Sequence, residues 1–362
     1  MTLIFFKKYT FLSVAAAVVL LSCSQAPLTV TKEEAISFAK DIESSIKKRD
    51  ADFLDNAFDK KEFIYRMHLP VSDEAKGFGD GVVNNMKMGT QMISSLNDDD
   101  SYDFIKYYNL NGKHHIIFRV FSNKSKGLNY QDYEIIKKSD KCKIADAYIY
   151  TTGETLAETI HNMYTSLYKK STQDPGGNDK DVAYLKSIGE MRMLVQKGKA
   201  TEAKQIFNEL PPYLKNTKVV LILNLYICSH LSLEDYDTAI KEFMTIFPNE
   251  PNMSLLMIDG YYLQKDYPKM LLAVNTLDAQ INKDPLLDYH RYLSYNLLGQ
   301  KDSSMFCLKR LMHNMPDFQQ AYLELITIDI NEGHNKEADS LIEVYRKKPK
   351  FDQKQLGRFA GK

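Results

Sequence analysis

The sequence predicts two folded parts: an α+β domain of helices plus a four-stranded antiparallel meander, then an all-helical array of about five helix pairs. Between residues 102 and 150 the apolar residues follow the period of strands, whereas elsewhere they follow the period of helices. A polar segment containing Pro175, Gly176 and Gly177 divides the chain, because these residues interrupt regular structure. After this segment a helical pattern recurs at intervals of roughly 34 residues.

The composition is that of a globular protein. Of the 362 residues, 44% are hydrophobic and 26% are charged, which suggests about two domains. Lys plus Arg equals 47 and Asp plus Glu equals 47, so the formal net charge is zero. A nucleic-acid-binding protein normally carries a basic excess, so we expect no nucleic-acid partner.

Residues 1–22 have the pattern of a secretory signal peptide. Lys7 and Lys8 precede an apolar run that is too short for a comfortable membrane span, and Leu20 and Ser22 lead into Cys23. This segment resembles a bacterial lipoprotein signal, which implies that the signal is removed and that Cys23 is acylated. The alternative interpretation is a buried helix that happens to contain a cysteine.

The resemblance also implies a location. Acyl chains on Cys23 would anchor the chain stably to a membrane through a lipidated tether of residues 23–29. Ser24, in place of Asp, implies sorting to the outer membrane, and residues 25–28 lack an acidic surface-export cluster. We therefore expect an outer-membrane lipoprotein that faces the periplasm.

The α+β domain is expected over residues 30–170 and begins with helices. Thr31 and Glu34 form a capping box, and an apolar stripe predicts a helix that continues to about Asn56. A short helix is expected over residues 60–67, and a glycine-interrupted helix between residues 72 and 96.

Four strands and a last helix complete this domain. Residues 102–110 and 114–121 flank Asn111-Gly112, a strong hairpin signal, and residues 130–137 and 143–150 continue the meander. A final helix is expected from Gly153-Glu154 to Tyr168. This order resembles the cystatin-like and nuclear-transport-factor-2-like folds, which implies a cone-shaped sheet with a pocket beneath its helix.

A linker is expected at residues 171–180, the repeat array at 181–355 and a tail at 356–362. The repeats share a small residue, followed four positions later by a large apolar one, and prolines close most of them. The small residues are Ala203, Ala239, Ala273, Ser304 and Ala338, and the apolar residues are Phe207, Phe243, Leu277, Leu308 and Ile342. This pattern resembles tetratricopeptide (TPR) repeats, in which helix pairs bury their apolar faces by stacking. An unrelated helical bundle is the alternative.

The TPR resemblance implies a concave groove that binds a protein partner. The groove positions are Leu185, Ile188, Leu221, Asn224, Leu255, Ile258, Leu286, Tyr289, Gln320 and Leu323. The Lys and Asn residues of the carboxylate-clamp type are not at these positions. The sequence also departs from the family twelve positions before each small residue, where it has Met191, Ile227, Tyr261, Tyr292 and Ile326.

Evidence for catalysis is sparse. The chain has no P-loop, GxGxxG, HExxH or GxSxG motif, so no cofactor or metal is expected. His114 and His115 lie on opposite faces of a strand, and either one could form an acid/base pair with Glu134 or Asp146. The alternative is a solvent-facing histidine pair. Besides Cys23, the cysteines Cys142, Cys228 and Cys307 are expected to be small buried hydrophobes.

The sequence therefore predicts a non-enzymatic, membrane-anchored lipoprotein whose TPR array binds a protein. The alternative is small-ligand binding, or a hydrolase or isomerase activity, in the α+β domain. A third possibility is a glycan-capturing lipoprotein, but such proteins favour tryptophan platforms and this chain has no Trp.

Overall fold

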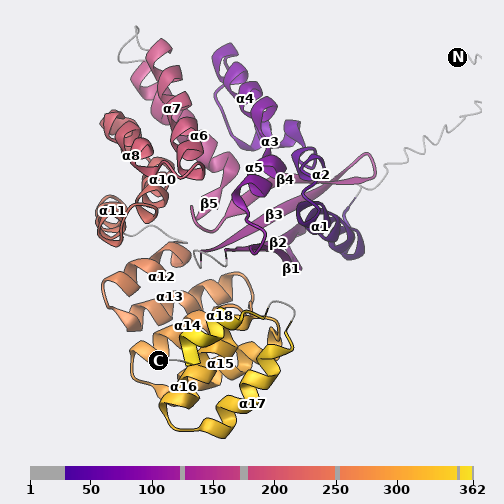
Figure 1. Cartoon of the computed structure of the whole chain (residues 1–362). Helices are drawn as coiled ribbons and strands as arrows, with labels where there is room; N and C mark the ends of the chain where they lie inside the picture. The colour runs from indigo at the N-terminus through magenta and orange to yellow at the C-terminus, as the bar shows by residue number, and fades with distance from the viewer. Residues whose placement is uncertain (1–28, 123–126, 172–177, 249–252, 349–350, 361–362) are drawn as a thin grey trace, which may run out of the picture.

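The computed structural model describes residues 29–122, 127–171, 178–248, 253–348 and 351–360 (Figure 1). The N-terminal half combines helices with one antiparallel sheet, and the C-terminal half is helical throughout the described residues. The signal peptide, Cys23 and most of the predicted linker lie outside the described residues.

Five helices precede the sheet: α1 (Lys32–Lys47), α2 (Asp52–Asp55), α3 (Lys60–Arg66), α4 (Asp73–Asn85) and α5 (Met88–Ser95). The capping box of Thr31 and Glu34 is present at the start of α1. The predicted continuation of this helix to Asn56 was wrong, because Lys48 caps α1 and Arg49 has a φ of 58°. The predicted glycine-interrupted helix is two helices, separated at Met86 and Lys87.

The sheet contains five strands in the order β1-β2-β3-β4-β5. Their bounds are β1 (Ser101–Leu110), β2 (Lys113–Phe121), β3 (Leu128–Lys138), β4 (Lys141–Ile149) and β5 (Glu154–Thr155). The first four are the predicted meander. The fifth was missed because Gly153, with a φ of 66°, reverses the chain so that Glu154 pairs with Ile149 before α6 (Leu156–Ser171) begins.

The helical half contains α7 (Asn178–Gln196), α8 (Ala200–Glu209), α9 (Pro212–Lys215), α10 (Lys218–Ser229), α11 (Leu233–Ile246), α12 (Ser254–Leu263), α13 (Tyr267–Gln280), α14 (Leu287–Leu297), α15 (Lys301–Asn314), α16 (Gln319–Asn331), α17 (Asn335–Arg346) and α18 (Gln353–Ala360). Five successive pairs pack closely: α7 with α8, α10 with α11, α12 with α13, α14 with α15, and α16 with α17. All five repeated small residues are buried, and so are Phe207, Phe243, Leu277 and Leu308.

Both faces of the sheet are covered. On β2, Ile116 and Phe118 belong to the core beneath α1–α5, whereas Ile117 belongs to a second core. That second core joins Ile117 and Tyr130 of the sheet to residues of α12, α13 and α14. The sheet therefore packs on the helical half, which curves around it in Figure 1. The two halves share a hydrophobic core despite the linker between them.

No helix in the described ranges is long and apolar enough to cross a membrane.

Candidate functional site

His114 and His115 face opposite sides of the sheet, as strand geometry requires. The ring of His114 lies on the side of α1–α5, where its Nδ1 is 2.9 Å from the hydroxyl of Tyr107. His115 lies on the side that faces the helical half, with Tyr108 stacked on its ring at 4.7 Å between centroids. The two histidines therefore belong to different environments.

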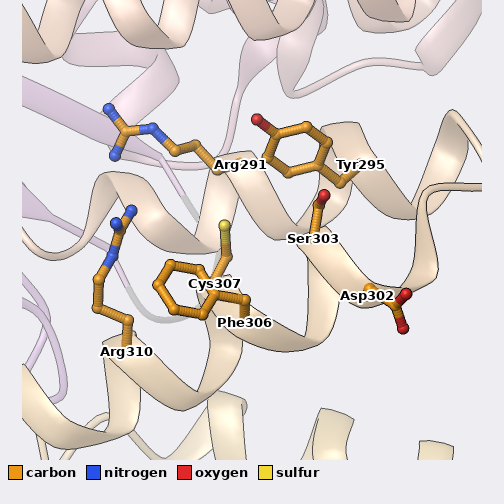
Figure 2. Close-up of a pocket in the computed structure, with 7 residues that line it drawn as sticks. All are labelled: Arg291, Tyr295, Asp302, Ser303, Phe306, Cys307 and Arg310. Atoms are coloured by element: carbon orange, nitrogen blue, oxygen red, sulfur yellow. The ribbon is translucent and has the colours of Figure 1, made fainter.

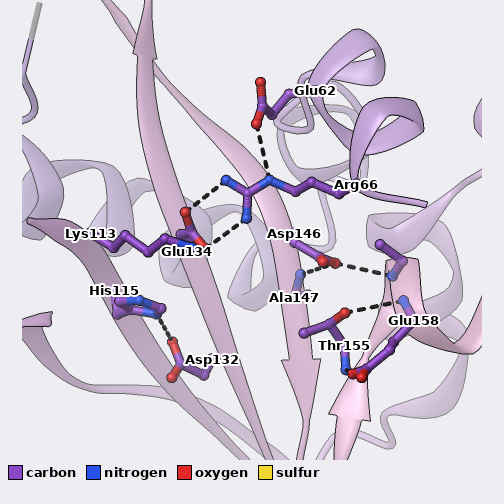
Figure 3. Close-up of polar contacts among 11 residues, drawn as sticks. Glu62, Arg66, Lys113, His115, Asp132, Glu134, Asp146, Ala147, Thr155 and Glu158 are labelled. Carbon is purple, nitrogen blue, oxygen red and sulfur yellow. Dashed lines mark hydrogen bonds and ion pairs between the residues drawn. The ribbon is translucent and has the colours of Figure 1, made fainter. Parts of the chain in front are cut away.

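His115 is paired with Asp132, which the sequence analysis did not select. The Nδ1 of His115 is 3.0 Å from Oδ1 of Asp132 (Figure 3), and the Tyr108 hydroxyl donates to Oδ2 of the same carboxylate. Asp132 stands two residues before Glu134 on β3, so both project from the same strand face. This alternation was the signal that could have identified Asp132.

Glu134 serves an ion-pair network instead of pairing with a histidine. Its two carboxylate oxygens accept hydrogen bonds of 2.7 Å each from Arg66 of α3 (Figure 3). The Nζ of Lys113 also donates to Oε2 of Glu134 at 3.2 Å. Arg66 also donates to Glu62 at 3.1 Å. Burial raises the pKa of Glu134, but Arg66 and Lys113 outweigh this effect and hold it below its ordinary value. Glu134 is thus a charged partner of Arg66.

Asp146 is buried beside the start of α6. It accepts hydrogen bonds from the backbone N–H groups of Ala147 at 2.8 Å and Ala157 at 3.2 Å. Burial raises its pKa, although these hydrogen bonds oppose the shift. Its contacts connect β4 to α6, and the predicted pairing of His114 or His115 with Glu134 or Asp146 is not formed.

The predicted groove residues are mostly interior residues. Leu221, Asn224, Leu255, Ile258, Leu286, Tyr289 and Leu323 are all buried, and Ile188 and Gln320 are half-buried. Leu185 belongs to α7, but its side chain is outside the described part of the structure. Leu255 and Ile258 share a core with Ile117 and Tyr130, so the chain's own sheet covers this section. The prediction that these residues line an open groove was wrong for the buried positions.

A charged network lies where the sheet meets the helical half. Arg119 of β2 pairs with Asp284 at 2.7 Å and with Asp103 at 2.9 Å. The hydroxyl of Tyr130 donates to the other oxygen of Asp284 at 2.7 Å. Burial lowers the pKa of Arg119, but the two carboxylates outweigh it and keep the guanidinium charged. This network leaves no local pattern in the sequence, because its members are far apart in the chain.

Three successive first helices expose one large side chain each. Met193 of α7 is 45% exposed, Tyr226 of α10 is 42% exposed and Tyr262 of α12 is 48% exposed. Arg192 is also exposed and donates a hydrogen bond of 3.3 Å to Gln91 of α5. Burial raises the pKa of Tyr226, and the positive charge of Arg192 opposes this shift. We call Arg192, Met193, Tyr226 and Tyr262 the α7–α12 surface. No repeat-consensus position predicted this set.

A cavity of about 410 Å³ lies between α14 and α15 (Figure 2). Arg291, Tyr295, Phe306, Cys307 and Arg310 line it, together with Asp302 and Ser303. Its arginines are already engaged, since Arg291 pairs with Asp278 and Asp288 and Arg310 also pairs with Asp288. The positive charges of this cavity are therefore already balanced by Asp278 and Asp288.

The described cysteines do not form a reactive or metal-binding set. Cys228 and Cys307 are buried, Cys142 is half-buried, and all three are free thiols. Burial raises the pKa of each thiol. Within the described ranges, no group of three or more His, Cys, Asp or Glu residues is arranged to hold a metal ion.

No protein-family model matches the chain, and comparisons with curated proteins and with solved structures find no match.

Proposed function

We propose that this protein is a lipoprotein of the bacterial envelope, anchored by acyl chains on Cys23, that binds a protein partner through its helical half. The order of basic residues, apolar run, small residue and cysteine in residues 1–23 supports the anchor. The exposed Met193, Tyr226 and Tyr262 support the partner site. Outer-membrane sorting and a periplasmic orientation are part of the same proposal.

The helix pairs are proposed to be divergent TPR repeats. In support, each repeated small residue is buried in a second helix, where it permits close approach of the partner helix. The pairs follow one another along the chain and pack on their neighbours, as repeat architectures do. Buried residues such as Ile227 and Tyr292 occupy the positions where the TPR consensus has a small residue.

The partner site is assigned to the α7–α12 surface. The predicted groove is unsuitable in the middle of the array, because Leu255 and Ile258 are already covered by the sheet. Exposed aromatic residues and arginine are enriched at protein interfaces, where they provide much of the binding energy. Tyr226, Tyr262 and Arg192 have this composition. The proposed partner therefore contacts the first helices α7, α10 and α12.

Site-specific photocrosslinking tests this assignment. A photoreactive residue at position 226 or 262 of the full-length protein is expected to form the same discrete protein adduct. The matched control is position 272 on the second helix α13, where Leu272 is 65% exposed. The adduct should be lost from position 262 when Tyr226→Ala is added. Identical crosslinking at position 272, or no adduct at 226 and 262, would contradict the proposed site.

The His115–Asp132 pair favours a second candidate function, a small-ligand or hydrolytic site in the α+β domain. A carboxylate that orients a histidine is a common element of acid/base catalysis. Here the same carboxylate is also held by Tyr108, and the His115 ring is stacked on Tyr108. These contacts equally suit a packed interface. A ligand screen separates the ligand-binding role from the packing role. A small molecule whose binding is lost in His115→Ala and kept in the control His114→Ala would support a ligand site.

A further inference from the structure

We propose that the end of the sheet formed by its two hairpin turns faces the membrane and contacts anionic lipid headgroups. This inference rests on the proposed acylation of Cys23. We call this region the hairpin end and define it by Leu110 and Lys113 at the β1–β2 turn, Lys138 and Lys141 at the β3–β4 turn, and Lys60 and Lys61 at the start of α3.

The strand register brings the two turns to one end of the sheet. Leu110 pairs with Lys113 across the first turn, and Lys138 pairs with Lys141 across the second. Because His114 pairs with Ile135, the first turn lies beside the last residues of β3. The two turns therefore lie at the same end of the sheet.

The first residues of two helices, α1 and α3, lie at the same end of the sheet. Lys137 of β3 forms a 2.7 Å ion pair with Glu34 in the first turn of α1. The N–H of Asp59, which caps α3, donates to the Ile144 carbonyl at 2.8 Å, near the start of β4. Lys60 and Lys61 are therefore next to the β3–β4 turn. The chain also enters the fold here, because α1 begins at Lys32.

The length of the tether between Cys23 and α1 limits how far the start of α1 can lie from the membrane. Eight peptide bonds separate Cys23 from Thr31, so the tether spans at most about 28 Å when fully extended. A chain of this size folds to a diameter of about 50 Å. An acylated Cys23 in a membrane consequently keeps the start of α1 within about 28 Å of the lipid surface, which favours orientations in which the hairpin end beside it is on the membrane side of the molecule.

The charges at this end suit a phosphate-bearing surface. Lys60, Lys61, Lys138 and Lys141 are exposed, and so are Lys113 and the apolar Leu110. The glutamates nearby are paired with basic side chains: Glu34 with Lys137, Glu62 with Arg66 and Lys138, and Glu134 with Arg66 and Lys113. Lys113 and Lys138 therefore each have one carboxylate partner, whereas Lys60, Lys61 and Lys141 form no ion pair within the described residues. The exposed acids are Glu33 and Asp140. Lysines within a Debye length of anionic headgroups are attracted to them, and Leu110 can enter the interface.

Lysine footprinting on the full-length mature protein tests this orientation. The lipidated protein is reconstituted into vesicles of phosphatidylethanolamine and phosphatidylglycerol, treated with a membrane-impermeant amine reagent and analysed by mass spectrometry. Relative to the protein in detergent, labelling of Lys60, Lys61, Lys113, Lys138 and Lys141 should fall several-fold. Lys309 and Lys336, which are exposed on α15 and α17, are the internal controls and should be unchanged.

A variant with fewer lysines tests whether their charges attract the hairpin end to anionic headgroups. The triple substitution Lys60→Gln, Lys61→Gln and Lys141→Gln should weaken headgroup contact by about fivefold per lysine and restore labelling of Lys113 and Lys138. The double substitution Lys309→Gln and Lys336→Gln should not. Thermal unfolding checks that both variants fold. Vesicles of phosphatidylcholine alone should protect the hairpin end less.

The outcomes distinguish this inference from the proposed anchor. If mass spectrometry finds no acyl group on Cys23, the anchor and the orientation are both overturned. If Cys23 is acylated but the hairpin end is labelled as strongly as Lys309 and Lys336, the orientation is overturned and the anchor stands. Equal protection by neutral and anionic vesicles would overturn the role of the lysines.

Discussion

At the scale of single residues, the most constrained charges lie where the sheet meets the helical half. Asp284, in the connection between α13 and α14, receives hydrogen bonds from Arg119 and Tyr130, both from the sheet. Its side chain is completely buried. A buried ion pair costs desolvation energy, so removing one member leaves an uncompensated charge. Arg119 and Asp284 should therefore be far more sensitive to substitution than the surface pairs.

We expect Arg119→Met to lower the free energy of unfolding by about 3–5 kcal/mol, because Asp284 loses its buried partner. Lys241→Met is the matched control: Lys241 is 61% exposed and pairs with Asp237 on the surface of α11, so the change should cost less than about 1 kcal/mol. Urea unfolding measures both. The double variant Arg119→Met with Asp284→Leu should recover part of the loss, and equal effects of Arg119→Met and Lys241→Met would contradict the prediction.

His290 should make the free energy of unfolding depend on pH. Burial lowers its pKa to about 4, although the charge of Asp284 opposes the shift. In the unfolded chain histidine binds a proton near pH 6.5, so from there down to about pH 4 the unfolded state binds more protons than the folded state. The free energy of unfolding is therefore not reduced by His290 above about pH 6.5, and it falls as the pH is lowered toward 4.

Wild-type protein should lose up to about 3 kcal/mol more between pH 7 and pH 4 than the variant His290→Gln. Urea unfolding at a series of pH values measures this difference. The control His313→Gln changes an exposed histidine and should keep the wild-type slope. If His290→Gln also keeps that slope, His290 is not the responsible group.

At the scale of elements, the helices beside the sheet show where glycine is required and where it is not. Gly89 lies in the first turn of α5, and a Cβ there would lie 2.3 Å from the Ala51 carbonyl oxygen. Its N–H donates to Asp55 at 2.7 Å, which holds α5 against α2. Gly77, in the middle of α4, has open space at the corresponding position. The two glycines should respond oppositely to alanine.

Gly77→Ala should stabilise the protein by about 0.5–1 kcal/mol, because alanine restricts the unfolded chain and favours helix. Gly89→Ala should destabilise it, because the new methyl group would collide with backbone. Thermal unfolding of the two variants provides the comparison. A stabilising Gly89→Ala would show that α5 can move away from Ala51.

At the scale of the whole molecule, the two halves depend on each other. Leu255, Ile258 and Leu277 of the helical half share a buried core with Ile117 and Tyr130 of the sheet. Phe121 of β2 also contacts Phe318, with ring centroids 5.8 Å apart. Separating the halves would expose these residues to water. The proposed partner surface on α7, α10 and α12 would therefore be presented by a single folded unit.

Full-length protein should unfold in one transition, and a fragment of residues 178–362 should be much less stable because its face toward the sheet is uncovered. Circular dichroism and a dye that binds exposed apolar surface measure these properties. A fragment that unfolds at the same denaturant concentration as the full chain would contradict the shared-core argument.

Local sequence patterns were enough to predict most of the helices and strands. Alternation and the Asn111-Gly112 turn predicted the first four strands, and Thr31 with Glu34 predicted the start of α1. The recurrence of Ala203, Ala239 and the other small residues predicted the buried positions of the second helices. These features depend on neighbours a few residues apart, which a sequence displays directly.

Only the tertiary structure decided what each face contacts. Leu255 and Ile258 were predicted to line a groove, but the sheet covers them. His115 is paired with Asp132, and Glu134 is taken by Arg66, which lies 68 residues away in the chain. Periodicity specifies that a side chain projects from one face of an element, but the partner on that face is set by long-range packing. The sequence by itself therefore determined most of the elements and their order, whereas the end of α1, the break between α4 and α5, the strand β5 and the surfaces that remained open depended on packing.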